Sequence, residues 1–306
     1  MEIRQLRYFL KIAELGSFSK ASLALHIAQP ALSQQMARLE DELGHPLLHR
    51  RHNGVRMTEQ GEALHAHARR VVKQIEDLPN VVKHCKDSLT GAVSLGLPQT
   101  TAPQFAMPLI AELGQRLPAV SVEFHDEMSG NLLRHLNSGQ LDIAVLVNDL
   151  DARLVNALPL MDEELFLASS ARQDHGARCR VADLAALPLA LPGVQHGVRA
   201  LVDSAIRAHG ASPRAPAIEA NSMGIMRRAV ECGMACSVMP WGAVCDEIGL
   251  GTIRITPLAP RLTRRVHVCT ARDGQLSLAG QAVRDLLIEI TRRRVESGQW
   301  LGVTLL

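Results

Sequence analysis

The chain has 306 residues, of which 47% are apolar and 21% charged, and its formal net charge is +2. This length exceeds one ordinary hydrophobic core and favours two domains. No apolar run reaches the roughly 18 residues that cross a bilayer, and Arg7 and Lys11 interrupt the stretch where a signal peptide needs its apolar core. We therefore expect a soluble, cytoplasmic protein.

The positive charge is concentrated at the N-terminus. Residues 1–90 carry 13 Lys and Arg against 10 Asp and Glu, whereas the remainder carries 20 against 21. Seven of the 13 histidines also lie in residues 1–90. A basic N-terminal part suits a head that binds nucleic acid.

Two short helices are predicted at the start of the chain. Apolar residues between positions 6 and 13 follow the i, i+3, i+4, i+7 spacing of one helix face, and Gly16 indicates its end. Ser17 is expected to cap a second helix around residues 20–26, with Ser19 as the alternative cap.

A third helix is predicted from Gln29-Pro30, because proline is favourable in the first helical turn, and Gly44 indicates its end. The joint at residues 27–29 is short enough for a helix-turn-helix. Four residues should form the buried stripe of this third helix: Leu32, Met36, Leu39 and Leu43.

A basic stretch at residues 49–58 follows, and it contains Asn53-Gly54, a strong signal for a tight hairpin. We therefore predict a β-hairpin wing after the third helix.

One long helix is predicted from Thr58 onward, with Thr58 as its cap. Its apolar residues repeat with a period of 3.5, at Gly61, Leu64, Ala68, Val71, Ile75, Leu78 and Val82. Such a heptad seam favours dimerisation, and the alternative is a helix packed on its own domain. Pro79 should end or kink this helix near Leu78.

From residue 91 onward, predicted strands and helices alternate. We expect strands at 92–97, 121–124 and 142–147, helices at 104–117 and 132–137, later strands at 164–168, 187–191, 235–239 and 266–270, and a final helix from 278 to about 294. Alternation of this kind predicts a parallel sheet with helices on both faces.

The third helix and the wing carry the candidate DNA contacts. Side chains near the start of a recognition helix reach base edges in the major groove first, and basic residues at a wing contact phosphates. The predicted DNA-binding residues are Ser19, Gln29, Pro30, Ser33, Gln34, Arg38, Arg50, Arg51 and Arg56.

The head also resembles a known family. The stretch FLKIAELGSFSKASLALHIAQPALSQQMARLEDELGHPLLHR, followed by GVRMTEQG, is similar to the DNA-binding head of LysR-type transcriptional regulators. Within that family, LHIAQPALSQQ, AHARR and SGQLD most resemble the nitrogen assimilation control type.

The resemblance implies a winged helix-turn-helix at 1–58, a linker helix at 59–90 and a regulatory domain at 91–306. That domain would be periplasmic-binding-protein-like, with one α/β subdomain at 91–161 and 267–300 and another at 162–266. The resemblance also implies a dimer of dimers on double-stranded, inverted-repeat operator DNA and a small-molecule effector, here expected to be an anionic metabolite. RNA polymerase is a further candidate partner, and no cofactor is expected.

The same resemblance places an effector cleft between the two subdomains. Its expected residues lie at strand ends and helix starts, where amides and hydroxyls can hold an anion: Gln99, Thr100, Thr101, Met128, Ser129, Asn148, His196, Asn221 and Ser222. Many relatives have serine after the first strand, where this chain has threonine, so the shape of the inducer is open.

Four other functions compete with this interpretation. An enzyme is disfavoured because GxSxG, HExxH, GxxxxGKS/T and GxGxxG are missing. An exported solute-binding protein would leave the head unexplained. A metal site would use His45, His49 and His52, or Cys232 and Cys236. A redox switch would use two of the six scattered cysteines, Cys85, Cys179, Cys232, Cys236, Cys245 and Cys269.

Overall fold

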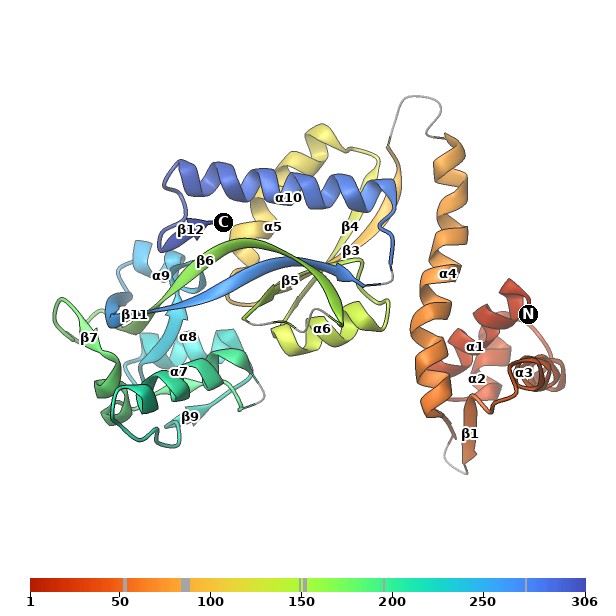
Figure 1. Ribbon diagram of the computed structural model, residues 1–306, viewed down its shortest axis with the longest axis horizontal. Coiled ribbons are helices and arrows are strands. Elements are labelled where there is room, and N and C mark those ends of the chain that lie inside the picture. The colour runs from red at the N-terminus through yellow and green to blue at the C-terminus, as the bar shows by residue number, and fades with distance from the viewer. Residues whose placement is uncertain (52–53, 84–88, 149, 151–152, 195, 273) are drawn as a thin grey trace. The chain divides into compact units, whose positions relative to one another are not determined.

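The computed structural model describes residues 1–306 except 52–53, 84–88, 149, 151–152, 195 and 273. Contacts divide the chain into two compact units (Figure 1): Met1–Ser88 with Asn137–Gln140, and Leu89–Leu136 with Leu141–Leu306. In the described part of the chain, no helix combines the length and the apolar character that crossing a membrane requires.

Three helices and a hairpin build the head of the first unit. They are α1 (Ile3–Leu15), α2 (Phe18–Leu25), α3 (Gln29–Leu43), β1 (Leu48–Arg51) and β2 (Gly54–Met57). Phe9, Ile12, Leu32, Met36 and Leu39 are buried together at their centre. Each of these residues lies on the apolar face of its helix, so one small core holds the head.

The predicted helix ends are confirmed. Gly16 ends α1 and Gly44 ends α3, both with a left-handed backbone that suits glycine. The Ser17 hydroxyl caps α2 by accepting the backbone N–H of Lys20. The expected burial of Leu43 is wrong, because this side chain is 37% exposed in the last turn of α3, beyond the core.

The hairpin pairs Arg51 with Gly54, and the predicted turn residue Asn53 lies outside the described residues. The long helix α4 (Glu59–Lys83) follows, and Thr58 Oγ1 accepts the backbone N–H of Gly61 at 2.9 Å, as a cap should. The helix continues through Pro79, so of the two expected effects of this proline, an end or a kink near Leu78, the end is wrong.

The heptad seam of α4 falls into two halves. Near its start, Gly61 and Ala68 are buried within the first unit, and Ala68 packs with Leu6 of α1. Further along, Ile75 is 39% and Leu78 55% exposed, and the side chain of Val82 lies outside the described residues. The helix therefore packs on its own head first and presents an uncovered apolar edge afterwards.

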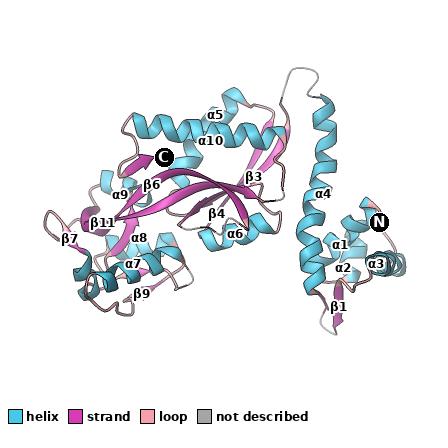
Figure 2. Cartoon of the chain, viewed as in Figure 1, coloured by secondary structure: helices cyan, strands magenta, loops and turns pink. Residues whose placement is uncertain are grey.

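The second unit combines six helices with ten strands among its described residues (Figure 2). Its helices are α5 (Ala102–Arg116), α6 (Ser129–Asn137), α7 (Gly197–Ala208), α8 (Met223–Glu231), α9 (Cys245–Gly249) and α10 (Leu278–Glu296). Its strands are β3 (Gly91–Pro98), β4 (Val120–Glu127), β5 (Ile143–Val147), β6 (Val155–Ser170), β7 (Cys179–Arg180), β8 (Ala190–Leu191), β9 (Ile218–Glu219), β10 (Ser237–Pro240), β11 (Ile253–Ala271) and β12 (Val303–Leu305).

The main sheet is mixed, in the order β10-β6-β11-β5-β3-β4. Strand β3 is parallel to β4 and β5, as predicted, but β11 is antiparallel to both β5 and β6. The edge strand β10 also pairs antiparallel with β6, so the expectation of a parallel sheet holds only for β3, β4 and β5. The chain leaves the first lobe along β6 and returns to it along β11. Because the two strands run in opposite directions, they pair antiparallel.

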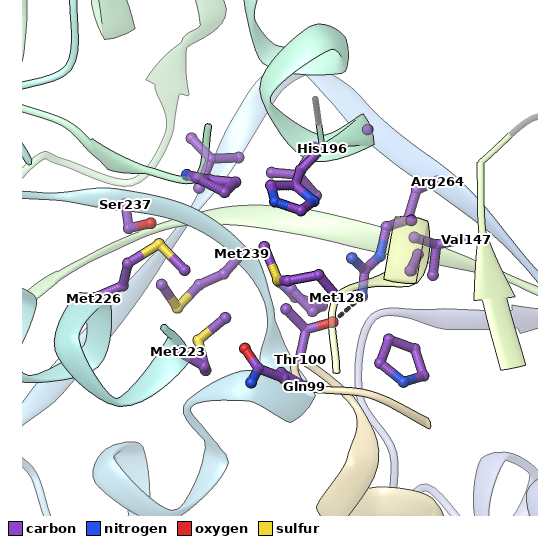
Figure 3. A pocket seen from close by; sticks show the side chains of 18 of the residues that line it. Gln99, Thr100, Met128, Val147, His196, Met223, Met226, Ser237, Met239 and Arg264 are labelled. Atoms are coloured by element: carbon purple, nitrogen blue, oxygen red, sulfur yellow. Dashed lines mark hydrogen bonds between the residues drawn. The ribbon is translucent and has the colours of Figure 1, made fainter. Parts of the chain in front are cut away.

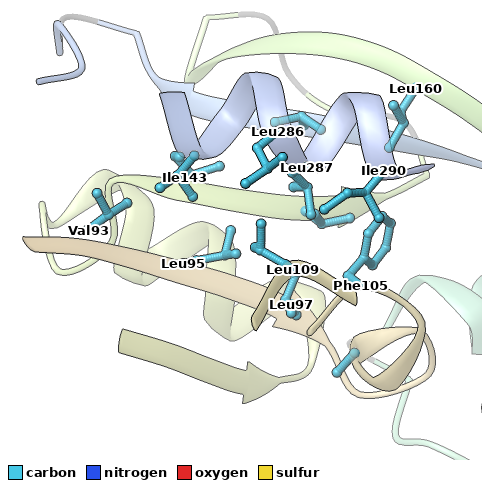
Figure 4. Close-up of a cluster of buried hydrophobic side chains, with 14 of the residues drawn as sticks. Val93, Leu95, Leu97, Phe105, Leu109, Ile143, Leu160, Leu286, Leu287 and Ile290 are labelled. Atoms are coloured by element: carbon cyan, nitrogen blue, oxygen red, sulfur yellow. The ribbon is translucent and has the colours of Figure 1, made fainter. Parts of the chain in front are cut away.

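These two long strands connect two lobes. The first lobe comprises β3, β4, β5, α5, α6 and α10, and the second comprises β7 to β10 with α7, α8 and α9. Each lobe has its own buried clusters, one on either face of its strands. In the first lobe, β5 sends Ile143 and Val145 toward α5 and α10, whereas Ala144 and Leu146 face α6. Figure 4 shows the α10 side of this core.

The approach of α4 to the head gives the first prediction. A Cβ on Gly61 would lie 2.1 Å from the carbonyl oxygen of Leu47, so Gly61→Ala must push the helix off the head. We expect a loss of about 1–3 kcal/mol in the free energy of unfolding, measured with urea. Gly114→Ala is the control, because its Cβ meets no atom within 4 Å and alanine should gain about 1 kcal/mol inside α5. Equal effects of the two substitutions would contradict this packing.

Candidate functional sites

The N-terminal half of α3 presents an exposed polar face opposite its buried stripe. Gln29, Gln34 and Arg38 are exposed, and Ser33 is half-buried. The Ser19 hydroxyl on α2 lies 3.0 Å from Gln29 Oε1 and donates a hydrogen bond to it. This bond joins the two helices of the helix-turn-helix at the surface where base contacts are expected.

The three wing arginines are also exposed. Arg50 and Arg51 lie on β1 and Arg56 lies on β2, next to the turn. The guanidinium carbon of Arg50 lies 4.4 Å from the centre of the Phe18 ring, a cation–π distance that holds this side chain against α2. Phe18 therefore links the wing to the helices.

A cavity lies between the two lobes of the second unit (Figure 3). One part of it, which we call the chamber, has a volume of about 60 Å³, and its lining includes Met128 and Val147 of the first lobe and Met223, Met226 and Met239 of the second. A second, more polar part of about 290 Å³, which we call the vestibule, shares Gln99, Glu127, Met128 and His196 with the lining of the chamber.

Most of the expected effector residues meet at this cavity. Gln99, Thr100, Met128, Ser129 and His196 line the chamber, and Gln99, Met128, His196 and Asn221 line the vestibule. Helices α6 and α7 begin here, with Ser129 and Gly197 at their first positions. Their unpaired backbone N–H groups make the rim favourable to negative charge.

Three expected residues lie outside the lining. Thr101 is fully buried at the start of α5, and the Ser222 hydroxyl accepts the backbone N–H of Ile225 to cap α8. Asn148 has a left-handed backbone and lies so close to Gly197 that a Cβ there would be 1.9 Å from its amide nitrogen. Asn148 thus supports the start of α7 from the facing lobe.

Sequence reasoning missed Arg264 and the three methionines of the second lobe. The strand predicted at 235–239 ends at Met239, next to the end of β10. The rule that ligands bind at strand ends could therefore have indicated this residue. Met223 and Met226 lie at the start of α8 and carry no polar signal. Arg264 comes from the middle of β11, which no local pattern marks as a site.

Arg264 makes a buried ion pair across the two connecting strands. Its side chain and that of Glu163 are each 1% exposed, and Arg264 Nη2 lies 2.6 Å from Glu163 Oε2. The same nitrogen donates to Thr100 Oγ1 at 2.8 Å, within the chamber lining. Burial raises the pKa of Glu163, and the Arg264 guanidinium opposes that rise.

Two more arginine–carboxylate pairs flank the pair between Arg264 and Glu163. Arg265 forms a two-pronged pair with Asp162, and Arg261 pairs with Glu164. Three consecutive acids on β6 are thereby matched by arginines on β11. The cavity also holds His196, whose pKa burial lowers, so this imidazole is neutral at pH 7.

The metal and redox rivals gain no support from the described residues. Among them, no three or more His, Cys, Asp or Glu side chains gather as a metal site would need, and His52 lies outside the described part. Burial raises the pKa of the Cys236 thiol to about 11 and that of Cys269 to about 12. Both thiols stay protonated at neutral pH, which slows their oxidation. Cys85 lies outside the described residues.

The buried pair gives the second prediction. Arg264→Met leaves the Glu163 carboxylate buried without its partner, and we expect a loss of about 3–5 kcal/mol in the free energy of unfolding. The adjacent Arg265→Met breaks the more exposed pair with Asp162 and should cost at most about 1 kcal/mol. Urea unfolding of both variants measures the difference. Similar losses would show that burial of the Arg264 pair does not matter.

Comparison with known proteins agrees with this architecture. The model of the bacterial regulatory helix-turn-helix protein of the lysR family matches residues 3–62, and that of the LysR substrate binding domain matches residues 86–292. The chain is 34% identical over 297 residues to the nitrogen assimilation regulatory protein nac of Klebsiella aerogenes, covering 96% of both chains. It is 33% identical over 306 residues to the nac protein of Escherichia coli strain K12, covering 98% of this chain and 99% of that one.

Among solved structures, a full-length OxyR variant from Pseudomonas aeruginosa has a TM-score of 0.75 at 26% identity and covers 95% of both chains. Two family models together account for the head and the second unit. The chain therefore belongs to the LysR family of helix-turn-helix transcription regulators, which bind DNA and are not enzymes.

Proposed function

We propose that this regulator acts in the cytoplasm as a dimer or a dimer of dimers on an inverted-repeat operator, and that a small molecule in the inter-lobe cavity modulates it. The observation that carries the proposal is the exposed polar face of α3, held outward by a fully packed opposite face. The effector part of the proposal rests on the cavity.

The packing of α3 supports the proposed assignment of the side chains that would meet DNA. Leu32, Met36 and Leu39 are at most 1% exposed, so the helix cannot rotate without exposing core residues. Gln29 and Gln34 then point away from the core, and glutamine can make paired hydrogen bonds to adenine in the major groove. Arg50, Arg51 and Arg56 supply the charge that holds the phosphates.

The exposed half of α4 supplies the pairing. Val71, Ile75 and Leu78 are 39–55% exposed and follow one helical edge, which a second copy of the same helix would cover. A pair related by a two-fold axis presents two α3 helices in opposite directions, so the matching operator is an inverted repeat.

Modulation would act through the lobes. A ligand that binds one arrangement of the lobes better than another shifts the population toward it. In an oligomer, that shift changes how the heads are spaced and how far the operator bends. The affinity for DNA need not change much.

The head gives the third prediction, which tests the proposal. Gln34→Ala should reduce discrimination at one operator position by about 1–3 kcal/mol, because a base contact is lost. Arg51→Ala should weaken binding to all sequences alike and reduce the salt slope by about one. Gel-shift titrations with the DNA upstream of the gene, at several salt concentrations, measure both. Arg178→Ala, on an exposed loop of the second unit, is the control. Equal loss of specific and nonspecific binding in both variants would refute this division of roles.

The exposed edge of α4 gives the fourth prediction. Ile75→Glu places a charge in the proposed helix pair and should convert the protein to a monomer, because a buried unpaired charge is strongly unfavourable. Gln74→Glu adds the same charge on the neighbouring exposed position and should leave the oligomer intact. Light scattering coupled to size exclusion gives the masses. A wild-type monomer, or an Ile75→Glu oligomer, would refute pairing through α4.

A further inference from the structure

The chamber and the vestibule differ in their chemistry, and this difference indicates which kind of ligand the cavity suits. The surface of the chamber is mainly apolar, and its lining includes four methionines, Met128, Met223, Met226 and Met239. Methionine thioethers are polarisable and flexible, so they adapt to the shape of an apolar group. A volume of about 60 Å³ is well below the roughly 150 Å³ of an apolar cavity that holds benzene, so the chamber suits a short aliphatic group.

The vestibule carries one charge of each sign. Glu127, at the end of β4, and Arg134, on α6, both line it. Glu127 also lines the chamber, and its Oε2 atom lies 3.7 Å from Nε2 of His135, a contact that is an ion pair only when this histidine is protonated. The remaining charge near the cavity is balanced, because Arg264 is paired with Glu163. A ligand with two or more negative charges would therefore find no surplus of positive side chains here. A ligand with one carboxylate and one ammonium would find a partner for each.

Gln99 adds a buried hydrogen-bond acceptor beside Glu127. Its Oε1 atom is buried and has no hydrogen-bond partner among the described residues. Gln99 and Glu127 are neighbours, because the backbone N–H of Gln99 donates to the Glu127 carbonyl oxygen at 3.2 Å. A buried acceptor without a donor costs free energy, and a ligand N–H would remove that cost.

Arg134 is the positively charged residue of the vestibule lining. One of its guanidinium nitrogens donates to Asn131 Oδ1 at 2.6 Å, which orients the side chain along α6. The planar guanidinium retains further N–H groups that match the geometry of a carboxylate.

We propose that the ligand is a free α-amino acid with a short aliphatic side chain. Its carboxylate binds Arg134, its ammonium binds Glu127 and Gln99, and its side chain enters the methionine chamber. This inference rests on the proposed function, since it specifies the molecule that occupies the same cavity. It replaces a general anion with a zwitterion of defined shape.

Calorimetric titration of the full-length protein with L-leucine tests the inference. Each comparison compound differs from L-leucine in one feature. 4-Methylpentanoate lacks the ammonium and 3-methylbutan-1-amine lacks the carboxylate. L-Glutamate has a charged side chain in place of the aliphatic one, and L-phenylalanine has an aromatic ring. We expect L-leucine to bind at least about tenfold more tightly than each of them. No binding of L-leucine at millimolar concentration, or equal binding of any comparison compound, would overturn the inference.

Charge-neutral variants assign the two ends of the ligand. Arg134→Gln should weaken L-leucine binding about tenfold or more without affecting 3-methylbutan-1-amine, and Glu127→Gln should weaken it similarly without affecting 4-methylpentanoate. The controls are Arg207→Gln, on the exposed end of α7, and Glu123→Gln, on the exposed part of β4, and both should bind like the wild type. An unchanged affinity in Arg134→Gln or Glu127→Gln would refute the assigned contacts.

Footprints on the operator separate this inference from the proposed function. If L-leucine fails to bind while a dicarboxylate such as succinate binds and changes the footprint, the ligand class is wrong and the proposed function stands. If L-leucine binds but the footprint is identical with and without it, the ligand class stands and the proposed modulation fails. If the unliganded protein does not protect its operator, the DNA-binding proposal itself fails.

Discussion

The antiparallel pairing of β6 with β11 is the constraint on which the second unit depends. These strands form the only long pairing that runs through both lobes in the described part of the chain, and their register sets Arg264 opposite Glu163. Because this pair is fully buried, a shift in register would leave two charges without partners. The same register places Arg264 beside Thr100 and thereby fixes one wall of the cavity. The cavity is thus a product of how the two lobes are joined.

Local signals in the sequence were sufficient where local chemistry decides the structure. Gly16, Ser17 and Gly44 mark helix ends because left-handed backbone and a capping hydroxyl act within a few residues. The family resemblance gave the order of the parts, and the two family models bear it out. Pro79 does not end α4, since a helix can continue past one missing backbone hydrogen bond when its remaining bonds are made.

Features that depend on distant segments were not predictable in the same way. The 16-residue β6 and the 19-residue β11 exceed the short apolar runs seen in the sequence, because each stabilises the other along its length. The exposure of Leu43 depends on where the head core ends, not on helical spacing. Strand ends indicated Gln99, Thr100 and Met128, whereas the second lobe's methionines enter the cavity only through the folding of the lobes together.

The divided seam of α4 has a practical consequence for dissecting the molecule. Ala68 and Val72 cover Leu6 of the head, although they lie ten or more residues beyond the wing. A fragment cut just after the hairpin would strip that cover and leave an apolar patch open to water. An autonomous DNA-binding fragment must therefore retain α4 at least through Val72, because any shorter fragment loses contacts that stabilise the head.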